Sequence, residues 1–214
     1  MKIKKYCNIY KFKLIIAIVF GTLIACNSQG KRTLLGKTEY QQKLNASYKD
    51  ASTSPLKSSD LKKFKGLDFF PVDSSYVVKA ILIKTKNAPV FRMATTTDRK
   101  PSYKEYGILS FTIKGIDCQL TVYQSQDDLR DEKYKNYLFL PFTDNTSGNE
   151  SYEGGRYMDV MTTDISNNNT LILNFNNTYN PYCAYNDMYS CPLTPRKNHL
   201  NLEIKAGIKK FKKS

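Results

Sequence analysis

The chain has 214 residues, 33 Lys and Arg against 19 Asp and Glu, and a formal net charge of +14. This length suits one domain with a hydrophobic core, and the 16 Tyr and 11 Phe favour a β-rich body over a disordered chain. Because the chain holds a single His, a His-rich metal site is excluded.

The first 25 residues follow the order of an export signal. Residues 1–13 carry five lysines and no acid, and an apolar run over residues 14–24 follows directly. This run is well short of the ~20 residues that a helix needs to cross a bilayer. Residues 1–25 are therefore predicted to be a cleaved signal peptide rather than a transmembrane anchor.

The run ends in Leu23-Ile24-Ala25-Cys26, which resembles the lipobox of bacterial lipoproteins. The resemblance implies that Cys26 becomes the N-terminus and carries acyl chains such as palmitate. Each buried methylene adds about 0.8 kcal/mol, so two or three chains anchor a protein stably. We expect an envelope lipoprotein in the outer or inner membrane, facing the periplasm and bound to the lipid bilayer through Cys26. The alternative is an ordinary signal peptide that contains a cysteine.

Cleavage before Cys26 removes five lysines and lowers the net charge from +14 to +9. Export makes nucleic acid the least expected partner of this basic chain. Lysines near a lipid anchor can each gain about 1 kcal/mol from anionic lipid head groups. Such a cluster lies at the C-terminus: Lys209, Lys210, Lys212 and Lys213. Solvated surface lysines are the alternative interpretation.

Residues 26–37 are predicted to be the lipidated cysteine and a polar spacer, followed by one or two short helices. Over residues 38–50, Tyr40, Leu44 and Tyr48 are spaced one turn apart, and Thr38 suits the N-cap. A second helix is predicted from residue 58 or 59 to the stop at Gly66.

From residue 76 onward the pattern changes to short strands separated by turn residues. They are predicted over residues 76–84, 90–95, 107–114, 116–124, 137–142, 156–161, 170–175 and 200–206. Lys114-Gly115 favours a tight hairpin turn. The prediction is a mainly β (α+β) fold with an antiparallel sandwich or barrel-like body, forming a single domain over residues 38–211.

Three cysteines remain after Cys26: Cys118, Cys183 and Cys191. In an oxidising periplasm the close pair, Cys183 and Cys191, is a candidate for a disulfide. One alternative is a thiol nucleophile that uses His199 as its base. Another is a zinc site from the same two cysteines, His199 and a carboxylate, although this spacing is not a standard one. We expect neither a metal nor a cofactor.

The most distinctive motifs lie between residues 140 and 207. They are Pro141-Phe142-Thr143-Asp144-Asn145-Thr146-Ser147-Gly148, Tyr152-Glu153-Gly154-Gly155-Arg156-Tyr157-Met158-Asp159, Leu173-Asn174-Phe175, Tyr179-Asn180-Pro181-Tyr182-Cys183-Ala184-Tyr185, Cys191-Pro192-Leu193-Thr194-Pro195 and Ala206-Gly207. With Phe64-Lys65-Gly66-Leu67 upstream, they strongly resemble the uncharacterised bacterial family named domain of unknown function 1684. The resemblance covers nearly all of residues 38–211 and implies no established activity. Thr194 and Ile208 stand where members usually carry a proline and an acid.

The same region concentrates polar and aromatic groups that a plain core does not need. Residues 144–159 and 174–191 are predicted to build a pocket for a small or acidic ligand, with Arg156 as the charge anchor and Asp144 as its orienting partner. The candidate ligand contacts are Asp144, Thr146, Tyr152, Arg156, Tyr157, Asn174 and Asn180. In the opposing interpretation Arg156 pairs internally with Asp144 or Glu153. Two other functions stay open: a hydrolase-like or thiol-dependent enzyme at the same pocket, and a structural envelope interaction module.

Overall fold

The computed structural model describes residues 36–212. The predicted signal peptide and Cys26 lie outside these residues, as does most of the predicted spacer. Within the described part of the chain, no helix is both long and apolar enough to cross a membrane.

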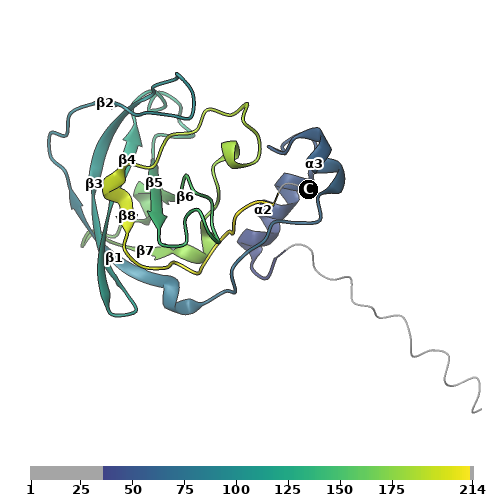
Figure 1. Cartoon of the computed structure of the whole chain (residues 1–214). Coiled ribbons are helices and arrows are strands. Elements are labelled where there is room, and N and C mark those ends of the chain that lie inside the picture. Colours follow the sequence, from purple (N-terminus) through teal and green to yellow (C-terminus); the bar gives the residue numbers. More distant parts are fainter. Residues whose placement is uncertain (1–35, 213–214) are drawn as a thin grey trace, which may run out of the picture. The chain divides into compact units, whose positions relative to one another are not determined.

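An antiparallel sheet forms a half-barrel (Figure 1). Its strands are β1 (Val77–Lys84), β2 (Phe91–Arg92), β3 (Ser102–Ile113), β4 (Ile116–Ser125), β5 (Tyr137–Asp144), β6 (Arg156–Met161), β7 (Thr170–Asn174) and β8 (His199–Leu200). The order is β6-β5-β4-β3-β1-β7, with β2 beside β3 and β8 parallel to β5. The mainly β prediction is confirmed, and the sheet takes the barrel-like form of the two that were predicted.

The main core lies on one face of this sheet because successive strand side chains point to opposite faces. Along β1 the buried residues Val78, Ala80 and Leu82 alternate with exposed neighbours. Strand β5 differs, because nearly all of its residues are buried. Its two faces therefore both carry packed side chains, and the second face positions the candidate site.

The predicted tight turn between residues 113 and 116 is confirmed. Ile113 pairs with Ile116, and the two residues between them, Lys114 and Gly115, have φ values of +50° and +80°. Positive φ at both positions is the geometry of a two-residue hairpin that follows the natural twist of the strands. This turn joins β3 to β4, the most extensively paired strands of the sheet.

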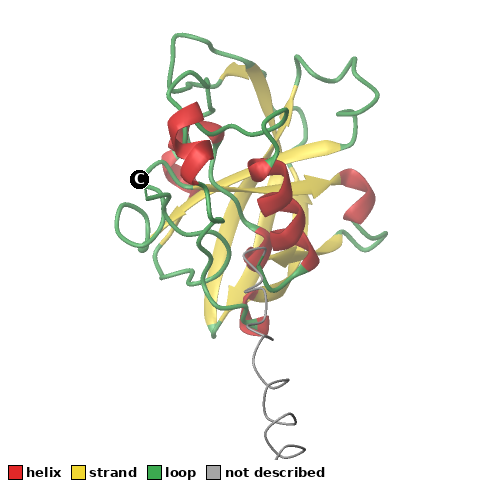
Figure 2. Ribbon diagram, turned by 90° about the vertical axis from the view of Figure 1, so that its right-hand side faces the viewer, coloured by secondary structure: helices red, strands yellow, loops and turns green. Residues whose placement is uncertain are grey.

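Among the described residues, two α-helices precede the sheet, α2 (Glu39–Lys49) and α3 (Ser58–Lys63). The Thr38 side chain caps α2 by accepting the Gln41 N–H at 3.2 Å. Figure 2 shows the helices set around the strands, with loops forming much of the remaining chain. A separate apolar cluster joins the helices to the C-terminal segment; its buried members are Tyr48, Leu56, Tyr185 and Ile208.

Three predicted strand boundaries are wrong. Residues 90–95 contribute only β2, and β3 begins at Ser102 rather than at residue 107. Residues 200–206 contribute only the end of β8. Ile204 and Ala206 are buried, which gives the segment the pattern of a strand, but their carbonyls accept hydrogen bonds from the Arg156 side chain instead of a neighbouring strand.

Candidate functional site

An aromatic pocket lies on the face of β5 opposite the main core. Tyr137 and Phe139 alternate with Leu138 and Leu140, so their rings leave the core and join a second cluster of rings. The cavity has a volume of about 330 Å³. It is lined by six tyrosines and five other residues: Tyr103, Tyr137, Tyr157, Tyr179, Tyr182, Tyr189, Phe139, Pro181, Ser190, Cys191 and Pro192. We call this cavity the aromatic pocket.

Backbone pairing holds the far walls of the aromatic pocket in place. Tyr157 of β6 exchanges two hydrogen bonds with Tyr179, of 2.8 and 3.0 Å. The ring of Tyr157 stands at 84° to that of Phe139 and at 87° to that of Tyr179. On the other side, the Cys191 carbonyl accepts the Thr96 N–H at 2.9 Å. The pocket therefore has ring walls nearly at right angles, on a backbone that is fixed at both sides.

Three hydroxyl groups of the pocket donate their protons to the protein. Tyr137 and Tyr179 both donate to Oδ1 of Asp159, over 2.8 Å for Tyr137. Tyr157 donates to the Pro192 carbonyl. Burial first, and then the Asp159 carboxylate, raises the pKa of Tyr137 well above its usual value. The phenols therefore remain neutral at physiological pH.

A pair of thiols adjoins the pocket. Cys191 lines it, and the Cys183 N–H donates to Cys191 Sγ at 3.1 Å. The Tyr152 hydroxyl lies 3.9 Å from Cys183 Sγ. A hydrogen bond from the Cys191 thiol is the main cause that lowers the pKa of Cys183 to about 7, and the same contact raises the pKa of Cys191. The structure therefore brings the two cysteines of the predicted pair together. Both are free cysteines here, and a disulfide between them stays a prediction.

His199, the base that the thiol alternative requires, is held elsewhere. It belongs to β8, and its Nδ1 lies 3.0 Å from the Thr143 hydroxyl. The side chains whose hydrogen bonds lower the pKa of Cys183 are those of Cys191, Tyr152 and Thr96. A catalytic pair of Cys183 and His199 is therefore not formed in this arrangement.

Arg156 and Asp144, the predicted charge anchor and its partner, form an ion pair in the protein interior. Both side chains are 0% exposed, and Arg156 Nη2 lies 3.1 Å from Asp144 Oδ1. Arg156 also donates to the carbonyls of Ile204, at 2.9 Å, and Ala206. Burial lowers the pKa of Arg156, and Asp144 opposes this shift. This arrangement agrees with the interpretation in which Arg156 pairs internally with Asp144. The guanidinium is not exposed to solvent, so an acidic ligand cannot reach it in this structure.

The other five predicted contacts lie in three different places. Thr146 and Asn180 are buried: Thr146 Oγ1 lies 3.0 Å from both oxygens of Asp144, and Asn180 donates to the Lys209 carbonyl at 2.9 Å. Tyr157 lines the aromatic pocket, and Tyr152 contacts the thiol beside it. Asn174 lines a different cavity. The seven candidates therefore do not converge on one site.

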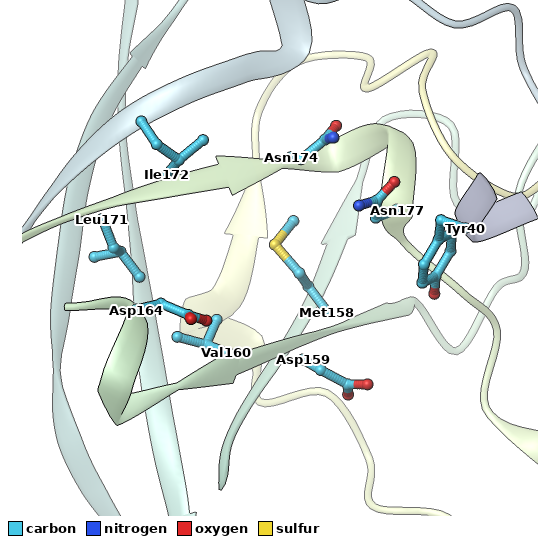
Figure 3. Close-up of a pocket in the computed structure, with 9 residues that line it drawn as sticks. All are labelled: Tyr40, Met158, Asp159, Val160, Asp164, Leu171, Ile172, Asn174 and Asn177. Carbon is cyan, nitrogen blue, oxygen red and sulfur yellow. The ribbon is translucent and has the colours of Figure 1, made fainter. Parts of the chain in front are cut away.

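This second cavity, of about 230 Å³, lies between β6 and β7, and we call it the edge cavity. Figure 3 shows Met158 and Val160 on one side of β6 and Asp159 on the other, with Asn174 on β7. Asp159 lines the edge cavity and is also bonded to two tyrosines of the aromatic pocket. It is therefore an acidic group that lines the edge cavity and contacts two walls of the aromatic pocket from outside.

Four residues that line the aromatic pocket lie outside the segments predicted to form the site: Tyr103, Tyr137, Phe139 and Pro192. The sequence does indicate Tyr137. Tyr137 and Phe139 lie on one face of the predicted strand, and Leu138, Leu140 and Phe142 lie on the other face. A strand that is apolar on one face and aromatic on the other indicates two packed faces. Tyr103 gives no such local signal.

Comparisons with known proteins extend over most of the chain. The family described as protein of unknown function (DUF1684) matches residues 62–209, which include every residue lining the aromatic pocket. A similar solved structure is the solution NMR structure of an uncharacterized protein from gene locus rrnAC0354 of Haloarcula marismortui. It is 32% identical, with a TM-score of 0.61, over 78% of this chain and 88% of that chain. No curated protein matches.

Proposed function

Since this chain belongs to the DUF1684 family of proteins of unknown function, we propose a function from its own residues. We propose that the protein is a membrane-anchored envelope lipoprotein that binds a small molecule in the aromatic pocket. The observation that carries the binding role is the open cavity of about 330 Å³ with six tyrosines in its walls. Small-molecule sites are typically concave and lined by apolar and aromatic groups with a few placed polar atoms.

The anchor is proposed from the sequence of residues 1–26, with its basic start, apolar run and terminal Ala25-Cys26. Acylated Cys26 would hold the domain at the bilayer on the periplasmic side. The basic C-terminal residues Lys209, Lys210 and Lys212 would then add attraction to anionic lipid head groups. On this proposal the domain meets its ligand in the cell envelope.

The anchor is tested by Cys26→Ala in the producing bacterium. Without acyl chains, the protein is expected to move from the membrane fraction to the soluble fraction and to lose the mass of its lipid. Fractionation and intact mass spectrometry measure both changes. Cys118→Ala, at a cysteine inside the domain, is the control and should leave the membrane fraction unchanged. A Cys26→Ala protein that still fractionates with membranes would show that the lipid anchor is the wrong explanation.

The binding role is tested by ligand-observed NMR with a library of ring-containing fragments and the full chain in detergent. Tyr182, which is 46% exposed and lines the pocket, is replaced by Ala. Loss of one ring wall should weaken the fragments that bind by about three- to tenfold. Met188→Ala, at a 74% exposed residue of the same loop that does not line the pocket, is the matched control.

If no fragment binds, or if both variants bind equally well, the small-molecule role is refuted and a structural envelope interaction module becomes the better account.

The thiol-dependent alternative rests on Cys183, whose pKa is lowered to about 7 chiefly by its contact with Cys191. It gains support only if the substrate of such an enzyme is consumed by the wild type and not by Cys183→Ser.

A further inference from the structure

Three of the six tyrosines that line the aromatic pocket offer a ligand hydrogen-bond acceptors rather than donors. A phenol has one proton to donate and lone pairs that accept. Tyr137 and Tyr179 give their protons to Asp159, and Tyr157 gives its proton to the Pro192 carbonyl. A ligand that matches these three hydroxyls must therefore bring its own donors.

Charged side chains outside the pocket are bonded to residues that line it. None of the eleven residues that line it has a charged side chain, but Asp159 is bonded to two of them. After burial itself, the Asp159 carboxylate is among the causes that raise the pKa of Tyr137 and Tyr179. At Tyr103, burial and then two further carboxylates raise the pKa to about 12, and Arg99 opposes them. Arg99 contacts the opposite wall: its side chain donates to the Ser190 hydroxyl at 3.2 Å and to the Ser190 carbonyl at 3.0 Å, so its donors are already used by the protein.

The ring walls add a second attraction for positive charge. A cation within about 6 Å of a ring face is attracted by the negative face of the π system, most strongly where water is excluded. Tyr157 stands nearly perpendicular to both Phe139 and Tyr179. Rings at right angles can contact one cation from more than one side.

Resting on the small-molecule site proposed above, we infer that the ligand of the aromatic pocket is an organic cation with a protonated amine, which the tyrosine rings and oxygens contact and the Asp159 carboxylate neutralises. No cationic side chain lines the pocket, the Arg99 guanidinium beside it is bonded to Ser190, and the buried guanidinium of Arg156 is already paired with Asp144. The ligand class is thus the reverse of the acidic one that the sequence suggested.

The positive net charge of the chain acts against this ligand only at long range. Fields from exposed charges fade over about 8 Å at physiological ionic strength. Asp159 is also exposed, but it contacts two walls of the pocket directly through hydrogen bonds. Local charge therefore decides the sign of the ligand.

Three probes of similar shape test the charge: benzylammonium, benzyl alcohol and benzoate. Each is titrated calorimetrically into the full chain in non-ionic detergent, against a detergent blank. Benzylammonium is expected to bind at least about tenfold more tightly than the other two. Asp159→Asn keeps an oxygen for the two tyrosine donors and should weaken benzylammonium by about tenfold while leaving benzyl alcohol unchanged. Asp164→Asn is the control, because Asp164 lines only the edge cavity and caps the Met161 N–H at 3.1 Å.

The outcomes separate the ligand class from the site itself. If benzyl alcohol or benzoate binds as tightly as benzylammonium, or if Asp159→Asn changes nothing, the cationic class is overturned. A failure of all three probes also overturns it. In each of these cases, ring-containing fragments that still bind and are weakened by Tyr182→Ala preserve the small-molecule role. If those fragments fail too, the proposed function falls with the inference.

Discussion

Asp144→Ala is expected to lower the free energy of unfolding by about 3–5 kcal/mol, because it leaves the buried charge of Arg156 without its partner. Asp144 is also the acceptor for the Ile204 N–H at 2.6 Å and for the Thr146 hydroxyl at 3.0 Å. The variant therefore leaves the Arg156 cation and two buried donors, the Ile204 N–H and the Thr146 hydroxyl, without their acceptor at once. Urea unfolding followed by circular dichroism measures the loss, which is a large fraction of the roughly 5–15 kcal/mol of a typical domain.

Glu39→Ala is the matched control for this change. Glu39 also forms an ion pair, with Lys43 at 2.7 Å, but both side chains are more than three-quarters exposed. Water and salt screen such a pair, so its removal should leave the urea midpoint nearly unchanged. If the two variants unfold at similar urea concentrations, burial is not what makes the Asp144 pair important.

A double variant tests whether the stranded charge is the cause. Asp144→Leu together with Arg156→Met removes both charges and fills their space with apolar groups. Such replacements of a buried pair are often neutral or stabilising, whereas removal of one partner is costly. The double variant is expected to unfold at a higher urea concentration than Asp144→Ala. A double variant as unstable as the single one would assign the loss to the hydrogen bonds of Asp144 instead.

The local sequence was sufficient to predict most of the sheet, because alternation along a strand is a short-range property. The boundaries of β6 were predicted correctly, and those of β1 and β4 to within one residue. The failure at residues 200–206 has a long-range cause. The carbonyls of Ile204 and Ala206 are satisfied by an arginine about fifty residues away in the chain, which no local pattern indicates.

The same limit explains why only part of the candidate site could be predicted from the sequence. An arginine beside two glycines has the same local sequence whether it faces a ligand or the interior. Arg156 is buried for two reasons that lie outside its local sequence. Strand β5, which carries Asp144, pairs with the strand of Arg156, and the C-terminal segment packs against the guanidinium and accepts its hydrogen bonds. The pocket walls likewise come from strands β3, β5 and β6 and from a distant loop. Sequence motifs marked the region, while the topology selected which of its residues reach a cavity.

Gly207→Ala is expected to lower the free energy of unfolding by about 3 kcal/mol. Gly207 has φ +76°, a left-handed conformation that costs an L-residue roughly 1–2 kcal/mol. A Cβ at this position would lie 1.9 Å from Thr178 Oγ1 and 2.6 Å from the Phe175 carbonyl oxygen. Relief of that overlap requires the backbone to shift, at a further cost of about 1–3 kcal/mol. The measurement is again urea unfolding.

Gly115→Ala separates these two causes. Gly115 has nearly the same φ, +80°, but an added Cβ would meet no atom within 4 Å. Its variant should therefore show the conformational cost alone, about 1–2 kcal/mol. The difference between the variants measures how closely the C-terminal segment approaches the residues after β7. Because the Gly207 carbonyl accepts the Phe70 N–H at 2.9 Å, a backbone shift there would also loosen the segment that leads into the sheet. Equal losses at the two glycines would contradict this close approach.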